Sequence, residues 1–321
     1  MKYMLFRSSV ILSLIAFFPN CVWGLDSTAN FLMDDNGRLL VLQIVGKGRR
    51  FTLSRGFPFI DKTRVLKVID LHSGSEVKTY LPTVPGLMDN AYSLDGRHIV
   101  CNINASAESS AKGFTHELTV WDIKSGREEI FRRKGSSAGG WGPETSGVSA
   151  DRKWILAKDH YKATLYSLQD DEQKSLEDGA EIFSARFSPT GSLYAYFRHN
   201  ELVIGEPSTG EFQRIPLDLN GNRYSGISLS WSPSGQYISG ILLSKTATGA
   251  TGSGAIGLWG SKGNLVKIIN PEVSVYPEWA PVWSLDENTI SLVYLARYKE
   301  NFEVHEIQVK SFSLSRTLLN Q

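Results

Sequence analysis

A short turn sequence recurs along this chain and constrains its fold more than any other feature. The clearest copies are Ser188-Pro189-Thr190-Gly191 and Ser232-Pro233-Ser234-Gly235. Proline fixes φ for the second position of a type I turn, and glycine accepts the left-handed conformation that follows such a turn in a hairpin. Because alternating apolar residues flank both copies, each is predicted to join two antiparallel strands.

Weaker copies of this turn begin at four other positions, Asp34, Ser93, Ser149 and Ser284. In two of them another residue replaces glycine: Arg152 occupies the glycine position, and Asn288 is predicted to be the left-handed residue of the last turn. A second hairpin follows the first, most clearly in the segments LKVIDLHSGSEVKTY (66–80) and LTVWDIKSGREEIFR (118–132). Each unit therefore holds four predicted strands in about 45 residues, which is typical of a propeller blade.

Six such units predict an all-β fold, a six-bladed β-propeller of four-stranded antiparallel blades. The predicted blades span residues 28–80, 88–132, 145–176, 182–216, 226–269 and 279–318. Four tryptophans lie in predicted strands: Trp121, Trp231, Trp259 and Trp283. They could fill the space between blades, but simple packing in the core is the expectation. Residues 25–33 could add a strand to the last blade and close the ring.

The segments FSPTGSLYAYF and WSPSGQYISGI resemble the repeats of TolB-like and WD-repeat-like six-bladed propellers, and VWDIKSG resembles the Trp-Asp hairpin of WD repeats. The resemblance extends over residues 25–321 at the level of the repeat, with the Ser-Pro-x-Gly turn intact in the fourth and fifth units. It implies a periplasmic or secreted propeller. It implies no catalytic residue, because the repeat motif contains none.

The first 24 residues have the layout of a secretory signal peptide. Lys2 and Arg7 precede an apolar run over 8–18, and Val22-Trp23-Gly24 offers a cleavage site. The run is shorter than the about 20 residues that span a bilayer. We therefore predict that 1–24 is removed and that 25–321 is a single propeller domain, periplasmic or secreted. An uncleaved membrane anchor and lipid attachment at Cys21 are the alternatives.

The charge balance and the cysteine content of the predicted mature chain argue against some classes of partner and against an internal disulfide. Removing Lys2 and Arg7 from the 34 basic residues leaves 32, against 33 acidic residues, so no basic excess favours nucleic acid. Cys101 is then the single cysteine and cannot form an internal disulfide; it lies in the apolar segment HIVCNIN and is predicted to be buried. No cluster of cysteine and histidine suits a metal, and we expect a monomer without a cofactor or metal.

The alternation of strands places the quoted turns on one face of the propeller and the longer connections on the other. Those connections are predicted at 46–63, 81–90, 104–116, 132–147, 217–228, 244–255 and 270–280. Because arginine and aromatic residues supply much of the energy of interfaces, we predict a binding surface on the second face. Its candidates are Arg55, Arg132, Arg133, Trp141, Tyr224, Tyr276 and Trp279. Scattered exposed residues of these types are also ordinary. Residues 246–255 (TATGATGSGA) are predicted to be flexible.

The case for catalysis rests on two histidines with neighbouring carboxylates. Asp159 precedes His160, and His199 lies two residues before Glu201, at tight turns of neighbouring units. Such pairs can perform acid–base chemistry, although solvated turn residues have the same composition. The sequence therefore favours a binding scaffold for a protein or cell-envelope component. A lyase or hydrolase acting on a polar or carbohydrate substrate at the channel mouth is the alternative, and a structural module of an envelope assembly is a third hypothesis.

Overall fold

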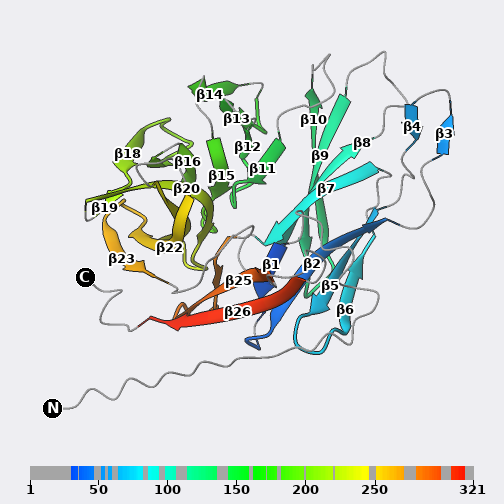
Figure 1. Ribbon diagram of the computed structural model, residues 1–321. Coiled ribbons are helices and arrows are strands. Elements are labelled where there is room, and N and C mark those ends of the chain that lie inside the picture. The colour runs from blue at the N-terminus through cyan, green and yellow to red at the C-terminus, as the bar shows by residue number, and fades with distance from the viewer. Residues whose placement is uncertain are drawn as a thin grey trace.

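The computed structural model shows six antiparallel β-sheets arranged as the blades of a propeller (Figure 1). It describes residues 30–34, 36–46, 52–54, 57–59, 64–81, 86–93, 98–105, 114–135, 144–158, 162–170, 172–178, 182–198, 200–219, 221–245, 251–270, 280–297 and 305–314. These ranges contain strands and turns and no helix, so none holds a helix that could span a membrane. The predicted all-β, six-bladed fold is confirmed.

The first three blades each contain four strands. Blade 1 is formed by β1 (Asn30–Met33), β2 (Leu39–Gly46), β5 (Arg64–Asp70) and β6 (Glu76–Tyr80). Blade 2 is formed by β7 (Gly86–Ser93), β8 (His98–Ala105), β9 (Phe114–Asp122) and β10 (Glu128–Gly135). Blade 3 is formed by β11 (Glu144–Val148), β12 (Trp154–Lys158), β13 (Lys162–Ser167) and β14 (Gln173–Asp178). A separate hairpin pairs β3 (Thr52–Ser54) with β4 (Phe57–Phe59).

The last three blades differ in their number of strands. Blade 4 is formed by β15 (Ile182–Phe187), β16 (Tyr194–Arg198), β17 (Glu201–Gly205) and β18 (Phe212–Pro216). Blade 5 is formed by β19 (Asp218–Leu219), β20 (Asn222–Trp231), β21 (Tyr237–Lys245), β22 (Thr251–Gly260) and β23 (Leu265–Ile269). Among the residues described, blade 6 holds only β24 (Val282–Trp283), β25 (Thr289–Arg297) and β26 (His305–Ser313).

The ring closes differently from the sequence-based expectation. Residues 30–33 form β1, which pairs with β2 in the first blade, Asn30 opposite Leu42, and they do not add a strand to the last blade. Blades 6 and 1 meet through apolar packing of Phe31 and Val41 against Val282 and Val293. The expectation failed on residues 30–33 because main-chain pairing with the neighbouring hairpin strand satisfies them locally.

The turns between the first and second strands adopt the predicted left-handed conformation at their fourth position. Gly191 and Gly235 have φ of 75° and 72°, and Arg152, which replaces glycine, has φ of 60°. In the last turn Glu287 has φ of 58°, so the prediction of Asn288 was wrong by one residue. Glu287 is the fourth residue of its turn, as Arg152, Gly191 and Gly235 are of theirs. Asn288 instead donates from its main chain and side chain to the Asp286 carboxylate and leads into β25.

Strands extend further into the predicted connections than the side-chain pattern indicated. Residues 251–255, predicted to be flexible, are the first half of β22, and Ala255 is buried. Similarly, β20 begins at Asn222 inside the predicted connection 217–228. The hydrogen bonds of a sheet come from the main chain, so small and polar residues can continue a ladder without an apolar pattern.

The predicted burial of the four tryptophans in the core is confirmed, and the core clusters that hold them join neighbouring blades. Trp121, Trp231, Trp259 and Trp283 are all buried. The tightest contact places Phe197 of blade 4 against two glycines of blade 5, where a Cβ added to Gly226 or Gly240 would lie 2.2 or 2.4 Å from the phenyl ring. Only glycine leaves this space, and the blades therefore interlock.

Candidate binding surface

The two faces of the propeller are built differently. The face with the turns that join first to second and third to fourth strands is called the turn face. The face with the connections between second and third strands and between blades is called the loop face. Because neighbouring strands in each blade are antiparallel, the two sets of connections lie at opposite ends of the sheets.

Neighbouring turns on the turn face contact one another. A Cβ at Gly191 of blade 4 would lie 2.5 Å from the main-chain nitrogen of Ala150 in blade 3. The Ser234 N–H of blade 5 donates to the Glu287 carboxylate of blade 6 at 2.5 Å. These contacts hold the turns of blades 3 and 4, and of blades 5 and 6, against each other.

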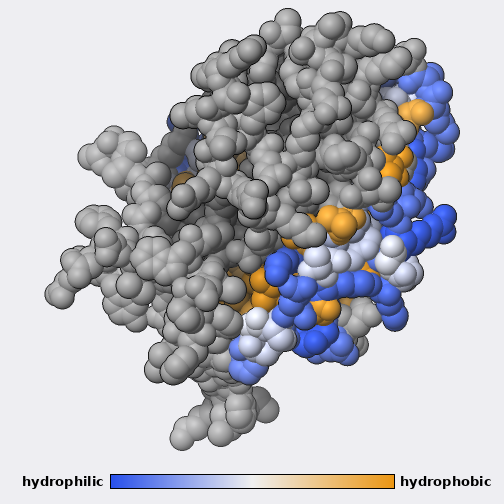
Figure 2. Space-filling model, turned by 90° about the vertical axis from the view of Figure 1, so that its right-hand side faces the viewer, coloured by the Kyte–Doolittle hydropathy of each residue, from blue (hydrophilic) through white to orange (hydrophobic). Residues whose placement is uncertain are grey.

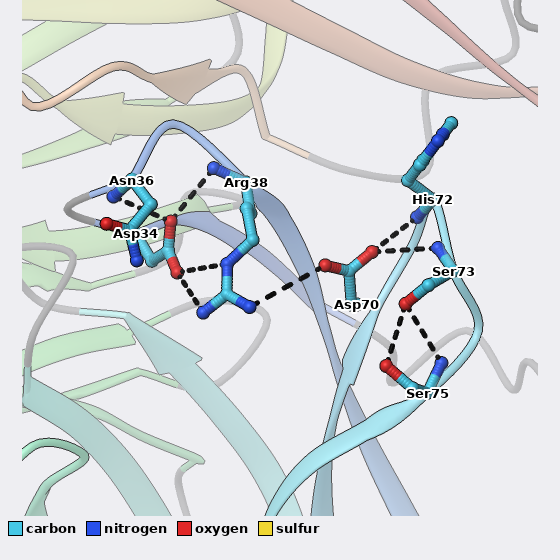
Figure 3. Close-up of polar contacts among 7 residues, drawn as sticks. All are labelled: Asp34, Asn36, Arg38, Asp70, His72, Ser73 and Ser75. Carbon is cyan, nitrogen blue, oxygen red and sulfur yellow. Dashed lines mark hydrogen bonds and ion pairs between the residues drawn. The ribbon is translucent and has the colours of Figure 1, made fainter.

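A polar cluster on the turn face of blade 1 is engaged by its own turns (Figure 3). Arg38 makes a two-pronged ion pair with Asp34, with Nε and Nη2 at 2.8 and 2.7 Å from Oδ2. Its Nη1 lies 3.9 Å from Asp70, whose carboxylate also accepts the main-chain N–H groups of His72 and Ser73. In Figure 3 the imidazole of His72 points away from the Asp70 carboxylate.

The electrostatics of the cluster follow from these contacts. The Ser73 main-chain hydrogen bond is the largest influence on Asp70, and with the His72 hydrogen bond it holds the pKa of that carboxyl below its ordinary value. Burial raises the pKa of Asp34, but hydrogen bonds from Arg38 and Asn36 outweigh it and lower the pKa overall. Both carboxylates are thus stabilised as turn-forming acceptors.

On the loop face, the structure places one of the seven predicted binding residues in full. Tyr224 is 9% exposed and packs in the core with Leu217 and Leu219. The main chain of Arg132 and Arg133 lies in β10, opposite Glu117 and His116 of β9.

The remaining predicted binding residues cannot be compared with one another. Arg55, Trp141, Tyr276 and Trp279 lie outside the described residues, as do the side chains of Arg132 and Arg133. The predicted binding patch therefore stays a prediction, with Tyr224 placed in the core beneath the face.

The catalytic hypothesis also stays untested at its centre, because Asp159, His160 and His199 lie outside the described residues. Glu201, the carboxylate nearest in sequence to His199, forms an ion pair with Arg198 at 3.1 Å across the tight turn of blade 4. In the part of the chain that is described, no group of histidine, cysteine, aspartate and glutamate side chains could hold a metal ion.

Cys101 lies in the core between blades 1 and 2, where it is fully buried with Leu66 and Trp121. Burial raises the pKa of its thiol strongly, which keeps it protonated. Nearby, the Tyr80 hydroxyl donates to Glu128 of blade 2 at 2.7 Å. The burial of Cys101 predicted from the sequence is confirmed, and its role is packing.

Sequence reasoning missed a recurring lysine in the fourth strands. Lys78 of β6 donates to the Ile123 carbonyl of blade 2, and Lys174 of β14 donates to the Pro207 and Ser208 carbonyls of blade 4. Each lysine thus holds the outer turn of the next blade. Aligning the fourth strands EVKTY, QKSLED and LVKII would have shown a lysine in each, at Lys78, Lys174 and Lys267.

No protein-family model matches this chain, and no curated protein matches its sequence. Two solved structures of Hsv2 from Kluyveromyces lactis are similar, with TM-scores of 0.45 and 0.44, 12% and 11% identity, and coverage of 83% of this chain and 70% and 69% of theirs. A crystal structure of Hsv2 from Kluyveromyces marxianus gives a TM-score of 0.43 at 11% identity, covering 89% of this chain and 82% of that one. The assignment of this chain to the propeller fold rests on its own strand pairing.

Proposed function

We propose that this chain is an exported β-propeller that binds a protein or cell-envelope component through its loop face. The observation that carries the proposal is the contrast between the faces. On the turn face, two pairs of neighbouring turns in the described residues contact each other: Gly191 lies against Ala150, and Ser234 is bonded to Glu287. Binding residues tend to lie on loops held by a rigid scaffold, and the longer connections are on the loop face.

The sequence supports the remaining parts of the proposal. The signal-peptide pattern of residues 1–24 and the resemblance to TolB-like and WD-repeat-like propellers support a periplasmic or secreted monomer. Arg55, Arg132, Arg133, Trp141, Tyr276 and Trp279 are the proposed contact residues. Tyr224, which packs in the core, would support the surface from below.

A capture experiment with two matched variants tests this proposal. Residues 25–321 are used as bait in envelope extract, beside a loop-face variant, Arg132→Ala/Arg133→Ala/Trp141→Ala. The control, Lys124→Ala/Arg127→Ala, removes an equal number of positive charges, two, from exposed positions of the turn face. We expect a partner that the control retains and the loop-face variant loses, with its Kd raised about 30-fold or more. A partner retained by both variants would disprove the assignment to this patch.

A further inference from the structure

The outer edge of β26 in blade 6 differs from the equivalent edge in every other blade. The strands that correspond to β26 in blades 1 to 5 are β5, β9, β13, β17 and β22. Each is paired on its outer side with a further strand, namely β6, β10, β14, β18 or β23. No strand in the described residues flanks β26 on that side. This edge is nine residues long, from His305 to Ser313, and is paired with β25 in a regular register.

The direction of the main-chain groups of β26 follows from the turn beside it. The Leu314 N–H donates to the carbonyl of Asn288, the residue just before β25, as the Leu71 N–H donates to the Leu39 carbonyl in blade 1. The main-chain groups of the preceding residue point to the opposite, outer side of the strand. In blade 1 that residue is Asp70, whose N–H donates to the Ser75 carbonyl beside the fourth strand, and in blade 6 it is Ser313. Because main-chain groups alternate in an antiparallel strand, five residues of β26 present outward N–H and C=O groups: His305, Ile307, Val309, Ser311 and Ser313.

Lys267 of blade 5 occupies the same position as Lys78 and Lys174, but it does not donate to a carbonyl of the next blade in the described residues. Lys78, Lys174 and Lys267 lie opposite Val68, Leu165 and Leu258, respectively, whose side chains pack toward the next blade. Since residues directly opposite share a face of the sheet, Lys267 points toward blade 6. Lys78 and Lys174 donate to carbonyls of the next blade, but Lys267 has no partner among the residues described.

Side chains near the outer strand of blade 1 are exposed. Lys67, which lies on the same face of β5 as Ile69, forms an ion pair with Glu76 at 2.7 Å, with both side chains more than a third exposed. Leu81, which follows β6, is 53% exposed and is the most exposed large hydrophobic residue described. Figure 2 looks onto the side of the molecule where β5 and β6 lie and shows hydrophobic residues among hydrophilic ones at the surface.

We propose that the outer edge of β26 is a strand-acceptor site for an extended segment of a partner protein that carries acidic and apolar residues in alternation. Main-chain pairing would supply affinity, as in other cases of β-strand addition. Lys267 of β23, which points toward blade 6, favours carboxylates in the added strand. Residues 315–321 of this chain contain Arg316 and no acidic residue, which makes them a poorer match. The site is separate from the loop-face patch of the proposed function.

The test uses residues 25–321 and a capped peptide, Val-Glu-Val-Glu-Val-Glu-Val. Hydrogen exchange of the β26 amides is measured with this peptide, with the same peptide N-methylated at alternate residues, and with a Val-Lys counterpart. We expect the first peptide alone to slow exchange at Val309, Ser311 and Ser313, by about tenfold when it is present at ten times its Kd. The N-methylated peptide cannot complete the ladder and should have no effect.

Three variants locate the site. Ser311→Pro removes one outward N–H at an edge position, where proline is tolerated, and should abolish binding, whereas Ser311→Ala should retain it. Lys267→Ala should weaken binding of the glutamate peptide by about two- to fivefold and reduce its advantage over the lysine peptide.

Other outcomes overturn the proposal. Amides of β26 that already exchange slowly without peptide would show that this chain covers the edge itself. Slow exchange that depends on protein concentration would show that a second copy does so. Equal effects of the methylated and unmethylated peptides, or no effect of either, would exclude strand addition. None of these results bears on capture through Arg132, Arg133 and Trp141, so the two proposals fail separately.

Discussion

Two interfaces between blades, equivalent in the repeat, are built in contrasting ways. Blades 4 and 5 interlock, with Phe197 against Gly226 and Gly240, and the Ser184 hydroxyl accepts the Leu229 N–H at 2.8 Å. Blades 6 and 1 meet through Phe31, Val41, Val282 and Val293, and their described residues share no side-chain hydrogen bond. A repeat fold is stabilised by interfaces between neighbours, so the chain should open first where that interface is weakest.

The other four interfaces each contain at least one polar contact in the described residues. Blades 1 and 2 share Tyr80–Glu128, blades 2 and 3 share Arg152–Glu129, and blades 3 and 4 share Lys174–Pro207. Blades 5 and 6 share a buried hydrogen bond from the Trp283 indole N–H to Ser239, at 2.8 Å. Among the described residues, the interface of blades 6 and 1 is therefore the one of the six that has no polar side-chain contact.

The largest expected effect comes from removing the aromatic side chain at the interlocked interface. Phe197→Ala should lower the free energy of unfolding by about 4 kcal/mol, because it leaves a cavity bounded by glycines that cannot fill it. Val293→Ala, at the contact of blades 6 and 1, should cost about 2 kcal/mol. Urea unfolding followed by tryptophan fluorescence measures both. Equal losses would remove the contrast between the two interfaces.

Adding one carbon atom at the same interface should be nearly as harmful. Gly240→Ala places a Cβ 2.4 Å from the Phe197 ring and should cost about 3 kcal/mol through overpacking. In a Phe197→Leu background the same change should cost much less, since the clashing ring is absent. A double-mutant cycle measures this coupling. Additive effects would mean that the glycine matters for another reason.

On the turn face, two glycines with similar φ should respond differently. Gly191→Ala combines a strained φ with a Cβ 2.5 Å from the Ala150 main chain, and should cost about 2 kcal/mol. Gly235→Ala has the same strain, but its nearest neighbour is the Thr190 side chain at 3.4 Å, so about 1 kcal/mol is expected. Thermal unfolding of both variants separates crowding from strain. If Gly235→Ala were the more costly, contact between turns would not be the cause.

The smallest expected effect is a dependence of stability on pH at Asp70 of blade 1. Its pKa is lowered in the folded chain, so the charged carboxylate stabilises the fold above its unfolded pKa of about 3.9, and this contribution is lost as pH falls through the folded value. Asp70→Asn keeps a hydrogen-bond acceptor but removes the charge. The wild type should exceed the variant by about 0.5 kcal/mol at pH 7 and lose this margin below pH 4. A margin that grows in acid would contradict the sign.

Much of the fold could be predicted from the sequence because the same turn residues and the same apolar alternation recur in each blade. The fourth residue of each turn is left-handed and is most often glycine, although Arg152 and Glu287 also adopt this conformation. Four strands per unit follow from apolar alternation. The exact residue is harder, as the last turn shows: Glu287 is left-handed, and Asn288 instead donates to Asp286. The turn predicted at Asp34 places β1 beside β2 in the first blade, as the structure shows. The further suggestion that these residues close the last blade failed, because pairing across the ring closure is a matter of topology that no local pattern encodes.

The candidate site could be predicted far less completely. Tyr224 was selected as an aromatic residue in a connection, but β20 begins at Asn222 and carries it into the core. Loop residues have no period against which to check such an assignment. By contrast, the lysines of the outer strands occupy equivalent positions, and an alignment of the repeats could have found them.

The order of strands also has a consequence for how the polypeptide can reach its final shape. In the described residues every sheet is assembled from one continuous stretch of chain, since β1 belongs to the first blade and no blade borrows a strand from the opposite end. A chain that emerges from its N-terminal end, from the ribosome or from an export channel, can therefore dock each blade on the one before it, with Gly191 contacting Ala150 and Glu287 contacting Ser234. The contact of Val282 and Val293 with Phe31 and Val41 joins the two ends of this series, so the chain would form an open arc that becomes a ring in its last step.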